Sequence, residues 1–496
     1  MNRYLIVLVL FAALLITCSK KQEPEDVLFK VGDKYVTVKE FRIRGEFTPH
    51  PNFSRHDRNL EKILLNNLIM EKIIAKERGK SSKLADSERF QDYIKGITEQ
   101  SMREELFYKV AFNTVQIDSA ELKKRFVLSQ REYDLEFYTI YNDSIAQNLD
   151  KRLKENPGKS VEIFNEIWDG GERPQWQVKW KDPDHINIHE ALYSGPLAQD
   201  SVIGPIPLEA NQWIILKVVN WRDHLLFGGE EQLQRWNEVV EKTTMNKASQ
   251  KWYKYIRGVM RGKQIEFDKD TFLKLARLTR QLESADDEQA QSDVMHRFWQ
   301  EEDSTLTIDD LPTEEAFLQR PFFTIDGVTW TVGDFRKAVA SHPLVYRPNT
   351  SGQLDFYTQF KMAIADLVRD HYLNKEAYKM GLDKDSKVLH TKEMWRDALI
   401  AAYERDQIVK ELASAFPDTS DPYRQSKLQK AVTTYMADLQ QKYIDEIQVD
   451  LQKFNSLELP KIQLFVQKVA APFPIAAPGW PVFSTDNTIE YQPLEK

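Results

Sequence analysis

The hydrophobic positions of the chain repeat one strand–turn–strand pattern, once near the start and once past the middle. The two stretches cover residues 29–41 and 323–335, with turns at Gly32-Asp33 and Asp326-Gly327. In each, a threonine is followed three positions later by an acid, which is typical of a helix start. The aligned positions are Phe29, Val31, Thr37, Val38, Glu40 and Phe41, matched by Phe323, Ile325, Thr331, Val332, Asp334 and Phe335. Each stretch therefore predicts a β-hairpin that leads into a helix.

Amphipathic helices are predicted after both hairpins. In the first copy, apolar residues recur at three- and four-residue steps up to Gly79, and 367–376 repeats this pattern in the second copy. The apolar positions are Leu60, Ile63, Leu64, Leu68, Ile69, Ile73 and Ile74, followed by a second stripe of Phe90, Tyr93, Ile94, Ile97 and Ser101. In the second copy that stripe is Met394, Leu399, Ala402 and Tyr403. Both copies are thus predicted to be mainly helical.

A third matching piece lies further along each copy. The positions that align without a gap are Tyr253, Ile265, Asp268, Phe272 and Leu275 with Tyr435, Ile447, Asp450, Phe454 and Leu457. The first copy is longer, which indicates an insertion over roughly residues 115–225. Within it, strands are predicted at 132–141, 176–180, 202–206 and 213–219, with helices at 145–153, 161–168 and 186–193. We therefore expect an α+β multidomain protein: two related helical domains and one small inserted α/β domain.

Composition and charge restrict the functional classes. The chain is 42% hydrophobic and 29% charged, with a formal net charge of −8. This acidic balance argues against nucleic-acid binding, which requires a basic face. No long apolar run follows the first 16 residues, and no phosphate-binding glycine loop or nucleophile elbow is found. We expect no cofactor and no metal.

Cys18 is the single cysteine, and the residues before it form a secretory signal. One positive charge at Arg3 precedes an apolar stretch over 4–16 that is too short to span a bilayer. Leu15-Ile16-Thr17-Cys18 resembles a bacterial lipobox, which implies that Cys18 carries the lipid; Thr17 departs from the usual small residue. The alternative is an ordinary signal peptide with an incidental cysteine. Ser19 resembles the outer-membrane sorting pattern, so we expect a lipid-anchored, periplasm-facing envelope protein.

The repeated element resembles the chaperone region of the parvulin-containing extracytoplasmic foldases, the SurA and PrsA kind. The resemblance rests on the hairpin and on Leu68-Ile69-Met70-Glu71 through Gly79. The insertion resembles a parvulin prolyl isomerase domain, with 132–137 as first strand, 188–193 as late helix, and 202–206 and 214–218 as final strands. In that family, segments on both sides of the parvulin module build the chaperone region. The resemblance implies binding of unfolded or assembling envelope proteins.

The chain departs from active parvulins at the catalytic histidines. By the resemblance, Phe137 stands at the first histidine position, and Ile214, or Trp213 beside it, stands at the second. Phe137, Trp180, Ile214 and Trp213 are the candidate pocket residues, and no catalytic residue is assigned. We expect a holdase-type chaperone with an inactive or weak isomerase module. The alternatives are an active parvulin-type peptidylprolyl isomerase and a structural lipoprotein with one dedicated partner.

The predicted organisation has seven parts, and one weak metal motif remains. The parts are a signal peptide (1–17), a tether (18–26), a first helical domain (27–115 plus 226–275), a parvulin-like domain (116–225), an acidic helical linker (276–320), a second helical domain (321–457) and a proline-rich tail (458–496). Asp184, His185, His189 and Glu190 have the helical spacing of metal ligands. No third histidine or cysteine accompanies them, so we interpret them as ordinary surface residues.

Overall fold

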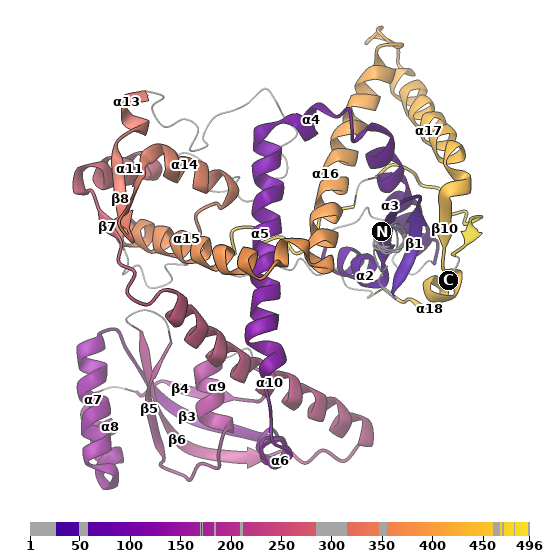
Figure 1. Cartoon of the computed structure of the whole chain (residues 1–496). Helices are drawn as coiled ribbons and strands as arrows, with labels where there is room; N and C mark the ends of the chain where they lie inside the picture. The colour runs from indigo at the N-terminus through magenta and orange to yellow at the C-terminus, as the bar shows by residue number, and fades with distance from the viewer. Residues whose placement is uncertain are drawn as a thin grey trace, which may run out of the picture. The chain divides into compact units, whose positions relative to one another are not determined.

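The chain forms two compact units, each with its own core (Figure 1). A computed structural model describes residues 26–48, 58–168, 170, 172–182, 185–208, 212–283, 315–346, 355–459, 467–468, 471–480 and 482–494. The first unit contains the residues up to Arg103 and from Gly262 onward, and the second is Glu104–Arg261. Cys18, the signal peptide and most of the predicted linker lie outside the described residues.

The first unit contains both predicted hairpins. The first consists of β1 (Val27–Val31) and β2 (Lys34–Thr37) and leads into α2 (Val38–Phe47) and α3 (Arg58–Arg78). The second consists of β8 (Pro321–Ile325) and β9 (Val328–Thr331) and leads into α14 (Val332–Ser341) and α15 (Phe356–Lys379). Thr37 and Thr331 cap the helices by accepting from the Glu40 and Asp334 amides. These local features follow directly from the residues at the turns and caps.

Each hairpin receives its third strand from the other copy of the repeat. β10 (Ile447–Val449) pairs with β1, placing Phe29 opposite Val449, whereas β7 (Glu266–Phe267) pairs with β8, placing Phe267 opposite Phe323. This corrects the predicted joining of 27–115 with 226–275. The repeat itself explains the error, because β7 and β10 lie in segments that align with each other. The sequence pattern is therefore compatible with pairing of either hairpin with either strand.

The helices follow the same exchange. α16 (Ser386–Ala413) packs on α3, and α17 (Arg424–Lys442) lies beside α16 (Figure 1). α5 (Glu88–Val110) contacts α15, because Glu99 of α5 accepts hydrogen bonds from Asn374 and Tyr378 of α15. The helices α4 (Lys83–Asp86), α11 (Lys269–Glu283), α13 (Glu315–Leu318) and α18 (Leu451–Ser456) complete the described elements of this unit. We call β1–α3 with α16–α18 the first half, and β8–α15 with β7 and α11 the second half.

Five buried charges lie at the centre of the first half: Glu40, Arg44, Glu71, Lys72 and Asp397, which we call the buried charge cluster. Arg44 makes two hydrogen bonds to the Glu71 carboxylate, of 2.8 and 2.7 Å. Lys72 Nζ lies 3.3 Å from Glu71 and 3.4 Å from Asp397 of α16. Burial would raise the pKa of Glu40, but Lys72, His390 and Arg44 outweigh burial and lower it to about 2. The cluster is therefore ionised and internally paired.

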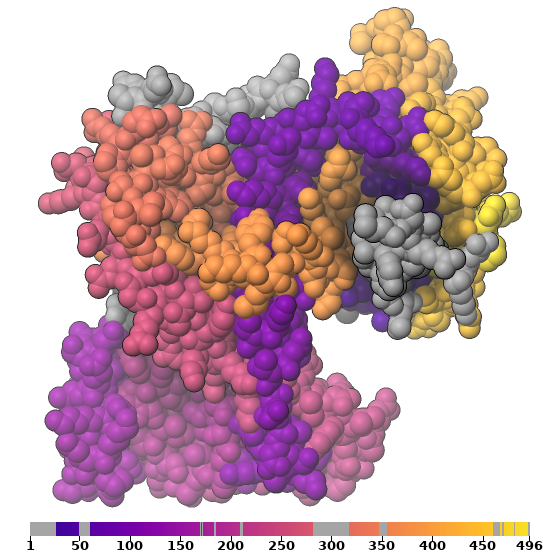
Figure 2. Space-filling model, in the orientation of Figure 1, coloured from indigo at the N-terminus to yellow at the C-terminus, as the bar shows by residue number. Residues whose placement is uncertain are grey.

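The proline-rich tail crosses the first half in an extended conformation. Its strand β11 (Gln492–Pro493) pairs in parallel with β10, so the sheet order is β11-β10-β1-β2. Phe473, Ala477, Trp480 and Phe483 are buried. Part of the tail is visible in yellow at the surface (Figure 2). The tail thus contributes to the core of the first half.

The second unit is built on one antiparallel sheet, in the order β4-β3-β6-β5. Its elements are α6 (Ser119–Leu128), β3 (Arg131–Ile140), α7 (Asp143–Glu155), α8 (Ser160–Glu166), β4 (Gln175–Val178), α9 (Ile186–Tyr193), β5 (Val202–Pro207), β6 (Trp213–Asp223) and α10 (Gly229–Val259). The α+β class is confirmed. This unit also includes α10 and the end of α5, beyond the predicted limits of 116–225. Among the described helices, none is both long and apolar enough to cross a bilayer.

The buried charge cluster yields a stability prediction. Arg44→Met should lower the free energy of unfolding of the first unit by about 3–5 kcal/mol, because Glu71 would remain buried without its main partner. Urea unfolding followed by circular dichroism measures the change. Lys379→Met, which removes an exposed pair with Glu376 on α15 of the same unit, is the control and should cost less than about 1 kcal/mol. Equal effects of the two substitutions would contradict the assignment.

Candidate functional site

The sheet of the second unit has two covered faces. One face packs under α9 and α10 through Tyr133, Leu135, Ile214, Leu216 and Val218. The other packs against α7 and α8 through Ile140 and Ile215. Neighbouring residues of a strand point to opposite faces, so adjacent positions on β6 belong to different cores. This alternation decides which predicted pocket residues meet.

Three of the four predicted pocket residues share one face. Phe137, Trp180 and Ile214 belong to the core under α9, with Trp180 and Ile214 fully buried. The Phe137 ring packs edge-on against Trp176 at 5.9 Å between centroids. Trp213 packs on the α7 face, where its Nε1 donates to Asp143 at 2.8 Å. Trp213 therefore lies on the opposite face of the sheet from the other three.

His189 is buried in the same core as Phe137 and Ile214. Its ring centroid lies 4.4 Å from that of Trp180 and 4.8 Å from that of Tyr193. Neither ring nitrogen makes a hydrogen bond of standard geometry within the described chain. Burial, with a further contribution from the positive charge of Lys242, lowers its pKa to about 3. His189 is therefore a neutral core residue at physiological pH, aligned with neither expected catalytic position.

The weak metal motif is used for structure. His185 Nδ1 accepts the Asn187 amide and caps α9, and Asp184 lies outside the described residues. Glu190 binds Arg125 of α6 through two hydrogen bonds of 2.9 and 2.6 Å. Burial would raise the pKa of Glu190, but Arg125 outweighs it and the pKa is lowered. Within the described ranges, no three His, Cys, Asp or Glu side chains are placed to hold a metal ion.

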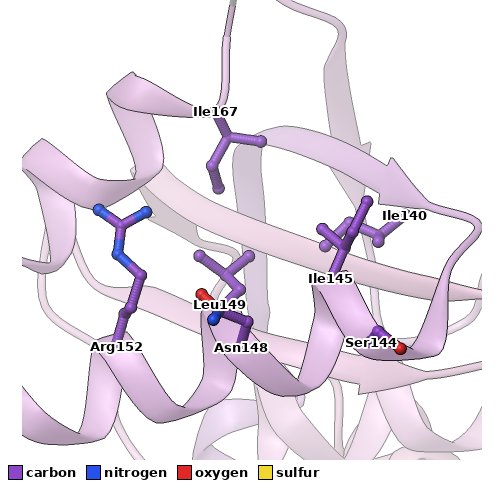
Figure 3. Close-up of a pocket in the computed structure, with 7 residues that line it drawn as sticks. All are labelled: Ile140, Ser144, Ile145, Asn148, Leu149, Arg152 and Ile167. Carbon is purple, nitrogen blue, oxygen red and sulfur yellow. The ribbon is translucent and has the colours of Figure 1, made fainter.

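An open cavity lies on the α7 side of the sheet (Figure 3). Its volume is about 360 Å³, and it is lined by Ile140, Ser144, Ile145, Asn148, Leu149, Arg152 and Ile167. The floor is aliphatic, and Arg152 at one end pairs with Glu166. Ile145 is 58% exposed on α7, although it lies four residues before the buried Leu149 on the apolar stripe of the helix. The exposure of a stripe residue depends on the packing around it, so the sequence pattern alone did not indicate the cavity.

A second exposed apolar group follows β6: Leu225, Phe227 and Leu233, which we call the apolar loop. These side chains are 67%, 86% and 62% exposed. The loop is held in place at Leu226, whose amide donates to Gln130 and whose carbonyl accepts from Gln232. Phe227 therefore projects from an anchored backbone. The sequence analysis missed this group, although Leu-Leu-Phe before Gly228-Gly229 was a visible signal.

Comparison with known proteins assigns no family. No family model matches the chain, and no curated protein matches its sequence. A crystal structure of the foldase protein PrsA from Streptococcus pneumoniae aligns with 44% of this chain and 86% of that chain. The identity is 12% and the TM-score is 0.18. Function must therefore be argued from the chain's own residues.

The buried imidazole predicts a pH dependence for the second unit. Below about pH 6.5 the unfolded chain binds a proton at His189, whereas the folded chain resists protonation down to about pH 3. The contribution to stability is complete above pH 6.5 and falls on acidification towards pH 3, with a slope of at most about 1.4 kcal/mol per pH unit. His189→Leu should flatten this part of the pH profile in urea unfolding. Identical profiles for His189→Leu and wild type would contradict the interpretation.

Proposed function

We propose that the protein is a lipid-anchored chaperone of the bacterial cell envelope that holds unfolded chains without catalysing a reaction. The observation that carries this proposal is the apolar loop. A soluble surface exposes single apolar side chains commonly, but three large ones within nine residues, on an anchored backbone, form a ready contact for unfolded chain. Unfolded segments expose apolar side chains of the same kind. Binding between the two needs no nucleotide, and the sequence has no phosphate-binding loop.

The chemistry of the second unit supports binding over catalysis. Prolyl isomerisation must overcome a barrier of roughly 18–20 kcal/mol by stabilising the twisted amide. At the two positions where the resemblance expects histidines, the chain has a phenylalanine packed on Trp176 and a buried isoleucine. His189, the histidine in that core, is neutral and enclosed by aromatic rings. We therefore infer that the module resembles a parvulin in its elements and has lost efficient isomerase activity.

The apolar loop should determine holding activity. Leu225→Ser, Phe227→Ser and Leu233→Ser together should lower affinity for an unfolded client at least tenfold, because each buried side chain contributes about 1.5–3 kcal/mol. Suppression of aggregation of a chemically unfolded protein, titrated with chaperone, measures the change. The control replaces Val127, Val328 and Tyr423, which are also exposed but scattered, with serine. Equal suppression by both triple variants would reject the role of the loop.

Isomerase activity should lie near background. The mature chain, added to a proline-containing test peptide, should accelerate cis–trans exchange by less than about tenfold over the uncatalysed rate, which has a time constant of tens to hundreds of seconds. Exchange measured by NMR gives the rate directly. Phe137→Ala is measured alongside and should also remain near background, since it opens space beside Trp176 without adding a polar group. Acceleration comparable with an active prolyl isomerase would show that the expected histidines are dispensable and would favour the enzymatic alternative.

Cys18 should determine membrane attachment. Cys18→Ala removes the thiol that would carry the lipid, so the protein should accumulate unprocessed or be released in soluble form. Membrane fractionation and metabolic labelling with a fatty-acid analogue measure both outcomes. Thr17→Ala, which restores a usual lipobox residue, should keep or improve processing. A Cys18→Ala protein processed and membrane-bound like the wild type would refute the lipoprotein assignment.

A further inference from the structure

The tail is held in the first half through its backbone. Asn67 Nδ2 donates to the Ser484 carbonyl at 2.9 Å, and its Oδ1 accepts the Phe483 and Ser484 amides at 2.6 and 3.0 Å. Asn66 Nδ2 donates to the carbonyls of Asp486 and Thr488. These bonds are made to groups that every peptide carries. Recognition of this kind depends little on the side chains of the bound segment.

Two further side chains extend this mode along the tail. Gln100 of α5 both donates to the Phe473 carbonyl and accepts its amide, at 3.0 and 2.9 Å. Arg44 donates to the Gly479 carbonyl at 2.9 Å. The tail makes few backbone bonds of its own in the described part, a bridge between Gln467 and Ile475 and a bond from the Lys468 amide to the Pro474 carbonyl. It therefore resembles a bound extended peptide more than an element with its own structure.

Aromatic side chains of the tail are buried between these backbone contacts. Trp480 packs edge-on against Phe41 at 5.8 Å, with the Arg44 guanidinium 5.3 Å above its ring. Phe483 is 6% exposed, whereas Val482 between them is 39% exposed. The tail thus buries aromatic side chains three residues apart and leaves Val482 largely outward. Unfolded protein segments offer the same combination of backbone and aromatic groups.

The asparagines are specific to the first half. Aligning Leu68 with Leu367, and Glu71 with Asp370, places Ala365 and Asp366 opposite Asn66 and Asn67. The second copy of the repeat therefore forms the equivalent helix without the two asparagines. Both asparagines are buried, at 3% and 4% exposure, beside Leu64, Leu65 and Leu68. A buried amide is costly without hydrogen-bond partners. The tail backbone supplies most of them; the others are the Ile63 carbonyl, which accepts from Asn67, and the Tyr491 hydroxyl, which donates to Asn66.

We propose that this groove is a binding site for extended, aromatic-containing segments of unfolded protein, and that the tail is its resident occupant. The groove is defined by Phe41, Arg44, Asn66, Asn67 and Gln100. The proposal rests on the proposed chaperone function and names a second contact for the same clients. A tail that belongs to the same chain as its groove competes as an intramolecular ligand, at an effective concentration above that of dilute clients. Clients therefore compete poorly until the tail is weakened, which makes the tail an internal inhibitor.

The test weakens the tail and offers a peptide in its place. The mature chain carrying Cys18→Ser is compared with the same chain carrying Trp480→Ala, and Val482→Ala is the matched control in the tail. The probe is a fluorescein-labelled peptide of residues 471–494, and its negative control has serine at positions 480 and 483. We expect Trp480→Ala to bind the probe at least tenfold more tightly than wild type and Val482→Ala to match wild type, by fluorescence anisotropy.

Two additions identify the site and the client class. Asn66→Ala and Asn67→Ala, placed in the Trp480→Ala chain, should reduce probe affinity at least tenfold, because the backbone contacts are lost. A reduced, carboxymethylated protein, which stays unfolded and soluble, should displace the probe. Failure of the Trp480→Ala chain to bind the probe would overturn the proposal, as would failure of the unfolded protein to displace it. Exchange of tails in a dimer of the Trp480→Ala chain, seen by light scattering, would assign the groove to a second copy and also overturn it.

Hydrogen exchange on the unmodified mature chain tests the proposal without a variant that could misfold. The amides of Phe473, Phe483 and Ser484 should exchange faster than those of α3, because the tail is released without unfolding the core. Exchange of the tail only together with α3 would make it a fixed core segment and reject the proposal. The proposed function fails separately, if wild type gives no suppression of aggregation and the apolar loop variant changes nothing. The aggregation experiment and the probe-binding experiment can fail independently, because the apolar loop and the groove carry different substitutions.

Discussion

Arg44 has no access to water, and the groups that hold it come from distant parts of the chain. Glu71 of α3 pairs with its guanidinium, the tail carbonyl of Gly479 accepts from it, and Asp397 of α16 completes the cluster through Lys72. An arginine buried without such partners costs several kcal/mol. Residues 40–72 and α16 must therefore be in place together, whereas the Gly479 carbonyl is an acceptor of a kind that any peptide backbone supplies. The packing of the first half depends on this one satisfied guanidinium.

The charges also distinguish the two halves of the repeat. By the hairpin alignment Arg44 corresponds to Ala338, and the acid of the second half, Asp370, is held by Arg103 and His342. Counted from their first residues, α5 and α16 place Arg103 opposite Ala401. If each half kept its own helix, Asp370 would lose Arg103 and keep only His342 and Arg369 from its own half. This ion pair therefore favours the exchanged arrangement.

Local features were predictable from the sequence, and long-range ones were not. The hairpins, the threonine caps and the elements of the second unit follow from neighbouring residues, so Thr37 and the strand at 131–140 lie where the pattern placed them. The exchange escaped prediction because β7 and β10 are alike in sequence. Of the candidate site residues, Phe137, Trp180 and Ile214 share a core, whereas Trp213, one residue along the strand, belongs to the opposite face. The hydrogen bonds of Asn66 and Asn67 could not be predicted, since their tail partners lie far away in sequence.

The pairing of β1 with β10 has a consequence for synthesis. A ribosome delivers the first hairpin early, but its third strand arrives only near the end of the described chain. Until then β1 has an open edge, which is a template for unwanted strand pairing. A product cut short before Ile447 cannot close this sheet and exposes that edge permanently. Chains that include β10 can therefore close the sheet, whereas shorter fragments stay exposed to the proteases that remove unfolded chains.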